Sequence, residues 1–246
     1  MSSANNKFIS NEAVVPIVKS ELFVGHEDVR YAIGVFSTKS VLEYKPGSLE
    51  QGILILRGNT YVDQTNMLDA KVKDIDGTEM DVDDDRSIHF AVFENHNVDE
   101  LDVKIPAYMR SIEITDDRVL PIQKFFPEVK VPLDSAEGSR FIVKHDDPRQ
   151  AKELMIAMLA IGLNDAWNRN VKNYYGVVEP IFERYLNIIT RKNANRVADP
   201  KMIPEYNDVN VGIIIDYDKL RENSFGENIT KNMKESGNGF KYWGKK

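Results

Sequence analysis

Three segments of the chain carry apolar residues at the spacing of a helix. In the first, Leu49, Ile53 and Leu56 fall on one face and form a continuous apolar stripe. The second opens on an aspartate followed by Pro148, a combination typical of a helix start, and it carries a stripe of Met and Leu residues. The segments predicted to be helical are residues 49–61, 148–169 and 181–190.

Runs rich in β-branched and aromatic residues lie between these segments and predict strands. The predicted strands are residues 88–93, 104–114, 139–143, 174–178 and 210–216, with a short apolar segment at 120–128. The resulting order is helix, strands, helix, strand, helix, strand. This order predicts a mixed sheet with helices packed on it, of the α/β or α+β class.

The two ends of the chain lack a regular pattern. Residues 1–48 are broken by Pro16, Pro46 and Gly47, which predicts an N-terminal arm of short elements. Residues 221–246 are rich in Asn, Gly and Lys and are expected to form a mobile C-terminal tail. The intervening residues 49–220 are expected to form one folded domain.

Composition narrows the class of protein. The 246 residues are 42% hydrophobic, enough for a sizeable core, and the net charge of -7 argues against a nucleic-acid partner. The chain has no cysteine, which excludes disulfides and thiolate catalysis, and its four histidines lack metal-ligand spacing. It has no apolar run of about 18 residues, the length of a transmembrane segment. The N-terminus also lacks the apolar core of a signal peptide, so we expect a cytoplasmic protein without a metal site.

Charged residues enter segments that otherwise read as buried. Glu137 and Arg140 stand at the start of a predicted strand, and Glu79, Asp81 and Asp84 belong to an acidic run upstream. Charged side chains are rarely buried unless they are paired. We therefore expect the arginine to meet the upstream carboxylates in bidentate ion pairs. Such a cluster is either a structural clamp or the wall of a polar site.

The acidic run also matches two unrelated patterns. Asp74-Ile-Asp76-Gly-Thr78 fits the Asp-x-Asp-x-Thr motif of haloacid-dehalogenase-type phosphohydrolases, but Ala70-Lys-Val-Lys73 before it is not the buried strand that such a site requires. A calcium loop starting at Asp74 has Glu79 at its sixth position, where glycine is needed. A solvent-facing turn at Asp76-Gly77 explains this stretch better than either motif.

Five short elements follow one another over residues 49–186, more than half of the chain. They are Arg57-Gly-Asn-Thr-Tyr61, Glu79-Met-Asp81-Val-Asp83-Asp84, Arg110, Phe126-Pro-Glu128 and Glu137-Gly-Ser-Arg140-Phe141. In this order they resemble the motifs of the acyl-homoserine-lactone synthases, the autoinducer synthases. The Glu-x-Ser-Arg-Phe element is the most specific of the five matches.

The resemblance implies a GNAT-like N-acyltransferase fold, a mixed sheet with splayed central strands and helices on both faces. It implies transfer of a fatty acyl group from an acyl carrier protein or coenzyme A thioester, a co-substrate rather than a permanently bound cofactor, to a small amine. The tryptophan that the family carries after its first element, near S-adenosylmethionine, has no counterpart here. We therefore favour the similar N-acyl amino acid synthases. The lack of a glycine-rich pyrophosphate loop favours acyl carrier protein as donor.

The resemblance also suggests roles for individual residues. Glu79 and Glu137 are the candidate bases, because a carboxylate whose pKa is raised by burial can take a proton from the attacking amine. The residues expected to contact or position substrates are Arg57, Tyr61, Asp81, Asp84, Arg110, Phe126 and Arg140. Two alternatives stay open. One is an acyl-homoserine-lactone synthase that uses S-adenosylmethionine, and the other is a catalytically silent GNAT-fold module that binds a thioester or a partner.

Overall fold

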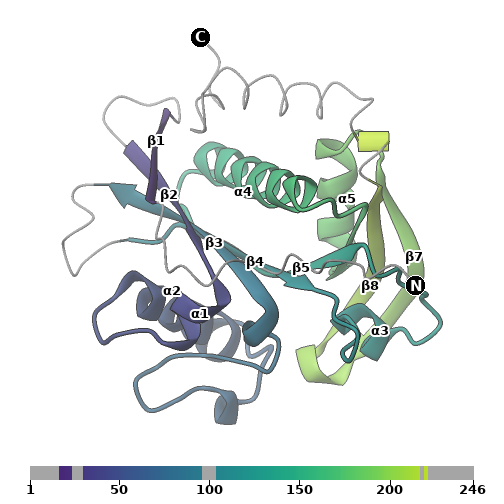
Figure 1. The fold of residues 1–246 in the computed structure, drawn as a ribbon, viewed down its shortest axis with the longest axis horizontal. Coiled ribbons are helices and arrows are strands. Elements are labelled where there is room, and N and C mark those ends of the chain that lie inside the picture. The colour runs from purple at the N-terminus through teal and green to yellow at the C-terminus, as the bar shows by residue number, and fades with distance from the viewer. Residues whose placement is uncertain (1–16, 24–29, 96–103, 217–218, 221–246) are drawn as a thin grey trace, which may run out of the picture.

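The computed structural model describes residues 17–23, 30–95, 104–216 and 219–220. Its centre is an eight-stranded sheet in the order β1-β2-β3-β4-β5-β6-β8-β7. Figure 1 shows the strands as arrows between the helices. Neighbouring strands are antiparallel except β5 and β6, which run parallel. The strands are Ile17–Phe23 (β1), Arg30–Phe36 (β2), Ser87–Asn95 (β3), Ala107–Glu113 (β4), Ser135–Val143 (β5), Asn173–Val178 (β6), Ala194–Ile203 (β7) and Asp208–Asp216 (β8). The predicted mixed sheet is confirmed.

Helices cover both faces of this sheet (Figure 1). The helices are Thr38–Leu42 (α1), Leu49–Gly58 (α2), Pro121–Phe125 (α3), Pro148–Asn168 (α4) and Pro180–Ile189 (α5). The side chain of Ser48 caps α2 by accepting a hydrogen bond from the Gln51 N–H, and a π-helical turn, Asn59–Gln64, extends this helix. Among the helices that the structure describes, none is long and apolar enough to cross a membrane.

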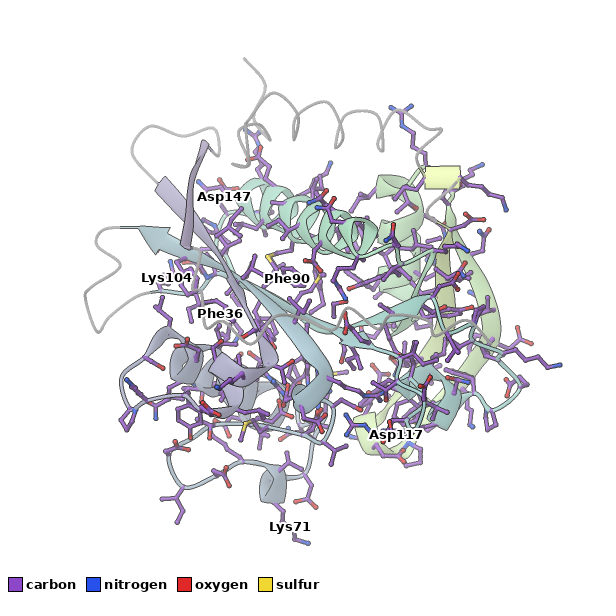
Figure 2. The ribbon with its side chains drawn as sticks, in the orientation of Figure 1. Phe36, Lys71, Phe90, Lys104, Asp117 and Asp147 are labelled. Carbon is purple, nitrogen blue, oxygen red and sulfur yellow. The ribbon has the colours of Figure 1, made fainter. Side chains whose placement is uncertain are left out.

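The central strands are buried on both sides, so they read as continuous apolar runs rather than as alternating ones. On β3, Phe90 points to the face covered by α4, where it joins a core with Leu154. On the opposite face Phe36 packs in a second core with Ile53 of α2. Figure 2 labels both phenylalanines, one on each side of the sheet. The two cores hold the sheet between its helical layers.

Some elements differ from the sequence prediction. Within residues 1–48, the short elements include β1 and β2, which extend the sheet because β2 pairs with β3 and β1 pairs with β2. Strand β7 was not predicted, because it contains Pro200 and most of its residues are exposed, as is typical of an edge strand. The expected tail, residues 221–246, lies outside the described residues. The division into arm, domain and tail stays a prediction.

Strands β5 and β6 diverge near the middle of the sheet. They pair from Ser135 to Gly138 of β5, after which β5 continues paired only with β4, and β6 only with β8. The register between β4 and β5 shifts between Tyr108 and Arg110, where β5 accommodates one extra residue. Arg140 lies in this bulge with a φ of 54°, a left-handed conformation that is uncommon for arginine. Because bulges bend and twist a strand, this one accounts for the splay.

Candidate active site

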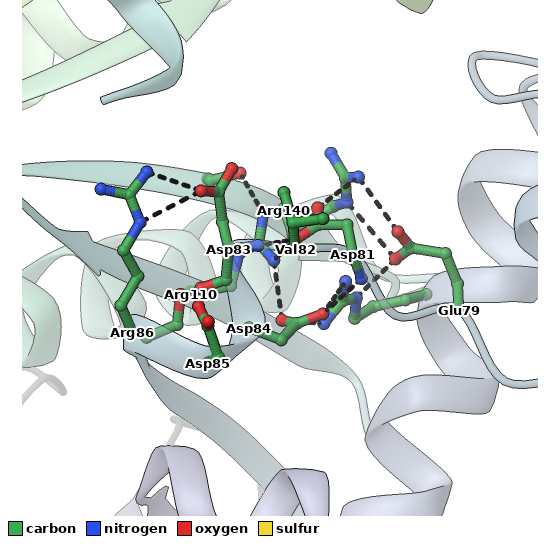
Figure 3. A network of polar contacts seen from close by, with 12 residues as sticks. Glu79, Asp81, Val82, Asp83, Asp84, Asp85, Arg86, Arg110 and Arg140 are labelled. Carbon is green, nitrogen blue, oxygen red and sulfur yellow. Dashed lines mark hydrogen bonds and ion pairs between the residues drawn. The ribbon is translucent and has the colours of Figure 1, made fainter. Parts of the chain in front are cut away.

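Three arginines and three carboxylates meet beside the splay, and we call them the ion-pair cluster. Its members are Arg57 of α2, Glu79 and Asp81 of the following loop, Asp84 of a short 3₁₀ turn, Arg110 of β4 and Arg140 of β5. Figure 3 shows the labelled side chains of Glu79, Asp81, Asp84, Arg110 and Arg140 converging from separate segments. The formal charges of the six groups cancel, which is the condition under which buried charges are tolerated.

The contacts within the cluster are short and partly bidentate. Asp84 accepts from Arg57 Nη1 and Nη2 at 2.7 and 3.0 Å, and from Arg110 Nη1 at 2.7 Å. Arg110 also donates to both oxygens of Asp81, at 2.6 and 2.9 Å. Glu79 bridges Arg57, at 2.6 Å, and Arg140, at 3.0 Å. The expected pairing of Arg140 with the upstream carboxylates is therefore confirmed.

The electrostatics of the cluster keep its carboxylates ionised. Burial alone would raise the pKa of Glu79, but the guanidiniums of Arg57 and Arg140 outweigh it, and the net pKa is lowered. The pKa of Asp84 is lowered in the same way, with Arg57 and Arg110 overcoming the effect of burial. A carboxylate that holds its charge this firmly accepts a proton poorly, so Glu79 is a weak candidate for the base.

A histidine that the motifs did not identify borders the cluster. His89 is fully buried, its Nδ1 lies 2.8 Å from the Tyr108 hydroxyl, and its Nε2 lies 3.8 Å from Asp84 Oδ1. Burial lowers its pKa to about 3, so the imidazole is neutral at physiological pH. It therefore adds a dipole rather than a charge to the cluster.

A cavity of about 320 Å³ occupies the gap between β5 and β6. It extends from the side of the sheet that carries Tyr61 and Arg140 to the side covered by α4 and α5. Its polar end is lined by Tyr61, Glu137, Ser139, Arg140, Glu179 and Tyr206. Its apolar end is lined by Met109, Leu159, Phe182, Leu186, Ile213 and Ile215. Of the Met and Leu stripe on the helix starting at Pro148, Leu159 lines this cavity, whereas Leu154 and Met158 are buried in the core.

Glu137 lies in this cavity rather than in the ion-pair cluster. Its side chain is 2% exposed, and its Oε2 accepts a hydrogen bond from the Ile122 N–H at 2.8 Å. Burial raises the pKa of Glu137 to about 8, against the opposing effect of this hydrogen bond. A carboxyl that titrates near neutral pH suits proton transfer. The two candidate bases thus have opposite electrostatic environments, and Glu137 has the suitable one.

Arg140 connects the cluster to the cavity. Its Nη2 donates to Glu79 and Asp81, its guanidinium carbon lies 5.2 Å from the Tyr61 ring centroid, and its Nη1 has no hydrogen-bond partner among the described residues. Tyr61 donates from its hydroxyl to the Phe141 carbonyl at 3.1 Å, so the ring is fixed on β5. The cavity is therefore lined by a rigidly held guanidinium with donors to spare.

Other sequence-predicted residues lie elsewhere. Phe126 is buried in a core with Ile112 and is not among the residues that line the cavity. Asp76 accepts hydrogen bonds from the Thr78 backbone and hydroxyl in an exposed turn, so the expected solvent-facing turn at Asp76-Gly77 is confirmed. Glu179 lines the cavity but was interpreted only as part of a helix start. Within the described ranges, no group of three or more histidine, aspartate or glutamate side chains could hold a metal ion.

Comparisons with known proteins identify the fold. No family model matches the chain, and no curated protein matches its sequence. Among solved structures, TofI, in a ternary complex with an inhibitor and MTA, aligns with a TM-score of 0.56 and 19% identity over 75% of this chain and 91% of its own. BjaI, a CoA-dependent acyl-homoserine lactone synthase with SAM and isopentyl-CoA, aligns with a TM-score of 0.56 and 16% identity, over 76% of this chain and 86% of its own. FeeM, an N-acyl amino acid synthase from uncultured soil microbes, aligns with a TM-score of 0.51 and 13% identity, over 78% of this chain and 95% of its own. The chain therefore has the GNAT-like fold of these synthases.

Proposed function

We propose that the protein is an N-acyltransferase that moves a fatty acyl group from a carrier thioester to the amine of a small metabolite, an amino acid. The observation that carries this proposal is the cavity at the splay, which is apolar at one end and carries Glu137 and Arg140 at the other. The same fold occurs in BjaI, an acyl-homoserine lactone synthase, and in FeeM, an N-acyl amino acid synthase.

The chemistry follows from this division of the cavity. The acyl chain lies in the apolar end, and the thioester carbonyl lies at the splay, where the free edge of β5 beyond Gly138 faces the cavity. The amine attacks the carbonyl carbon, the C–N bond forms, and the C–S bond breaks. Ionised Glu137 takes the proton that the amine loses, and the thiolate leaves. Backbone N–H groups along the free edge stabilise the oxyanion.

The acceptor is held by charge. Arg140 Nη1 is positioned to bind a carboxylate of the acceptor, because its Nη2 is already fixed by Glu79 and Asp81. Arg57, Asp84 and Arg110 contact each other rather than the cavity, so they act as positioning residues that hold Arg140 and its partners. An amine that also carries a carboxylate, as an amino acid does, fits this arrangement better than a simple amine.

Purified protein is expected to release thiol from an acyl thioester when an amino acid is supplied, and mass spectrometry is expected to detect the N-acyl product. Because the chain has no cysteine, a thiol reagent such as dithionitrobenzoate reports only carrier thiol. Parallel reactions contain acyl carrier protein or coenzyme A thioesters, with an amino acid mixture or S-adenosylmethionine. Release of methylthioadenosine would instead identify a homoserine-lactone synthase. Thioester binding without thiol release would indicate a silent binding module.

The exposed face of α5 bears on the choice of donor. Ile181, Tyr185 and Ile188 are each at least 50% exposed and follow one another at helical spacing, with exposed Arg184 beside them. The opposite side of α5 lines the cavity. An apolar stripe flanked by positive charge suits an acidic acyl carrier protein. We therefore propose carrier protein rather than free coenzyme A as the main donor.

Charge reversal on this face is expected to weaken only the carrier-dependent reaction. Replacing Arg184 and the nearby exposed Arg191 by Glu should raise KM for acyl carrier protein about tenfold, through two lost charge interactions, and leave the coenzyme A reaction unchanged. Lys39→Glu, an exposed position on α1 across the sheet, is the matched control. Equal losses with both donors, or a similar loss in the control, would contradict docking at α5.

A further inference from the structure

A glycine interrupts the middle of α4, the long helix that covers the cavity. Gly162 is buried and its backbone is an ordinary part of the helix, so conformation does not require glycine there. Glycine is unfavourable inside a helix relative to alanine. Its presence therefore points to a constraint from packing rather than from the backbone.

The constraint is the side chain of Met109 on β4. A Cβ at position 162 would lie 1.8 Å from Met109 Cε and 3.3 Å from its Sδ, far inside contact distance. The hydroxyl of Tyr174 would lie 3.6 Å from the same point. The terminal methyl of Met109 thus occupies the notch that the missing side chain leaves in α4.

This contact forms part of the cavity wall. Met109 and Tyr174 both line the cavity, as does Leu159 on the preceding turn of α4. Tyr174 is itself packed against a glycine, since a Cβ at Gly138 would lie 2.7 Å from its ring. The apolar end of the cavity is therefore bounded by two large side chains that two glycines accommodate.

We propose that the Met109–Gly162 contact sets the length of the acyl chain that the cavity accepts, an inference that rests on the proposed acyltransferase function. Methionine has three rotatable side-chain bonds and adapts to the space offered. A Cβ at position 162 would expel its methyl from the notch, and the cavity is the unfilled space beside it. The cavity would shorten. Removing the Met109 side chain would instead join the notch to the cavity and lengthen it.

The test compares Gly162→Ala, Met109→Ala and the double variant in a mixture of saturated acyl thioesters from butanoyl to hexadecanoyl, with products resolved by mass spectrometry. Gly162→Ala is expected to shift the preferred chain to shorter acyl groups and Met109→Ala to longer ones. For each methylene of the acyl chain that the cavity cannot hold, kcat/KM for that thioester should fall at least about tenfold. The double variant should follow Met109→Ala, because the clash requires the methionine. Met158→Ala, a buried position of the same core that does not line the cavity, is the control.

Several outcomes separate the possibilities. An unchanged product distribution in both single variants, or shifts in the same direction, would overturn the inference while leaving the acyltransferase intact. Absence of any product from the wild type would instead reject the proposed function. Thermal unfolding would reveal whether Gly162→Ala folds. If it does not, Met109→Ala still tests the proposal, which requires that this variant make products with longer acyl chains.

Discussion

Replacing Glu137 by Gln is expected to lower kcat by about 10²- to 10⁴-fold, the usual contribution of a positioned general base. Gln keeps the size of the side chain and can still accept a hydrogen bond from the Ile122 N–H, so the cavity should keep its shape. Burial raises the pKa of Glu137 to about 8. The wild-type rate should therefore rise with pH until about 8, as the carboxyl ionises, and the variant should lack this dependence.

The same substitution is expected to stabilise the protein at alkaline pH. The carboxyl of Glu137 has an ordinary pKa of 4.5 and a folded pKa of about 8. Between these values the unfolded chain has lost the proton that the folded chain keeps, so stability falls as pH rises through this window. The wild type should lose on the order of a few kcal/mol between pH 5 and pH 8 at this site. Gln does not ionise and avoids that loss.

Urea unfolding at pH 5 and pH 8 measures this difference, and the thiol-release assay measures the rate. Glu43→Gln, at an exposed position on the C-terminal side of α1, is the matched control and should change neither quantity. A variant that keeps wild-type turnover would remove Glu137 from the mechanism. If Glu137→Gln were instead less stable than the wild type at pH 8, the ionised carboxylate would be stabilising the folded state, contrary to the burial seen here.

Local sequence was sufficient to predict one pairing within the ion-pair cluster, that of Arg140 with the upstream carboxylates. Arg140 enters an apolar strand, and a buried guanidinium must meet carboxylates, which the acidic run at Glu79 and Asp81 supplies. The register that brings them together, however, depends on a bulge at Arg140, a residue type that rarely adopts a positive φ. The splay therefore followed only from the family resemblance and not from any local pattern.

Local sequence could not separate the two candidate bases. Glu79 and Glu137 each belong to a motif that contains other charged residues, and both are buried. They differ because Glu79 meets two guanidiniums directly, whereas Glu137 meets one backbone N–H. These partners come from distant segments, so only the tertiary structure separates them. Phe126 shows the same limit: its motif suggested a substrate contact, but its ring packs in a core away from the cavity.

Asp84→Asn is expected to destabilise the protein by about 3–5 kcal/mol, the cost of leaving buried charges without their partner. Asp84 accepts hydrogen bonds from Arg57, Arg110 and the Asp81 N–H, and its side chain is fully buried. An amide loses the negative charge, and its NH₂ group would face guanidinium donors. A loss of this size is a large part of the stability of an ordinary domain, so low soluble yield and a lowered unfolding midpoint are expected.

Asp85→Asn provides the matched control, because Asp85 is the next residue, is half exposed, and pairs with Arg118 at the surface. Exposed ion pairs contribute about 0–1 kcal/mol, so this variant should unfold almost as the wild type does. The comparison holds chain position and chemistry constant while burial changes. If Asp84→Asn instead folds with wild-type stability but loses turnover, the cluster is needed for the reaction rather than for the fold. Arg57 and Arg110 would then serve to position Arg140 for the reaction rather than to stabilise the fold.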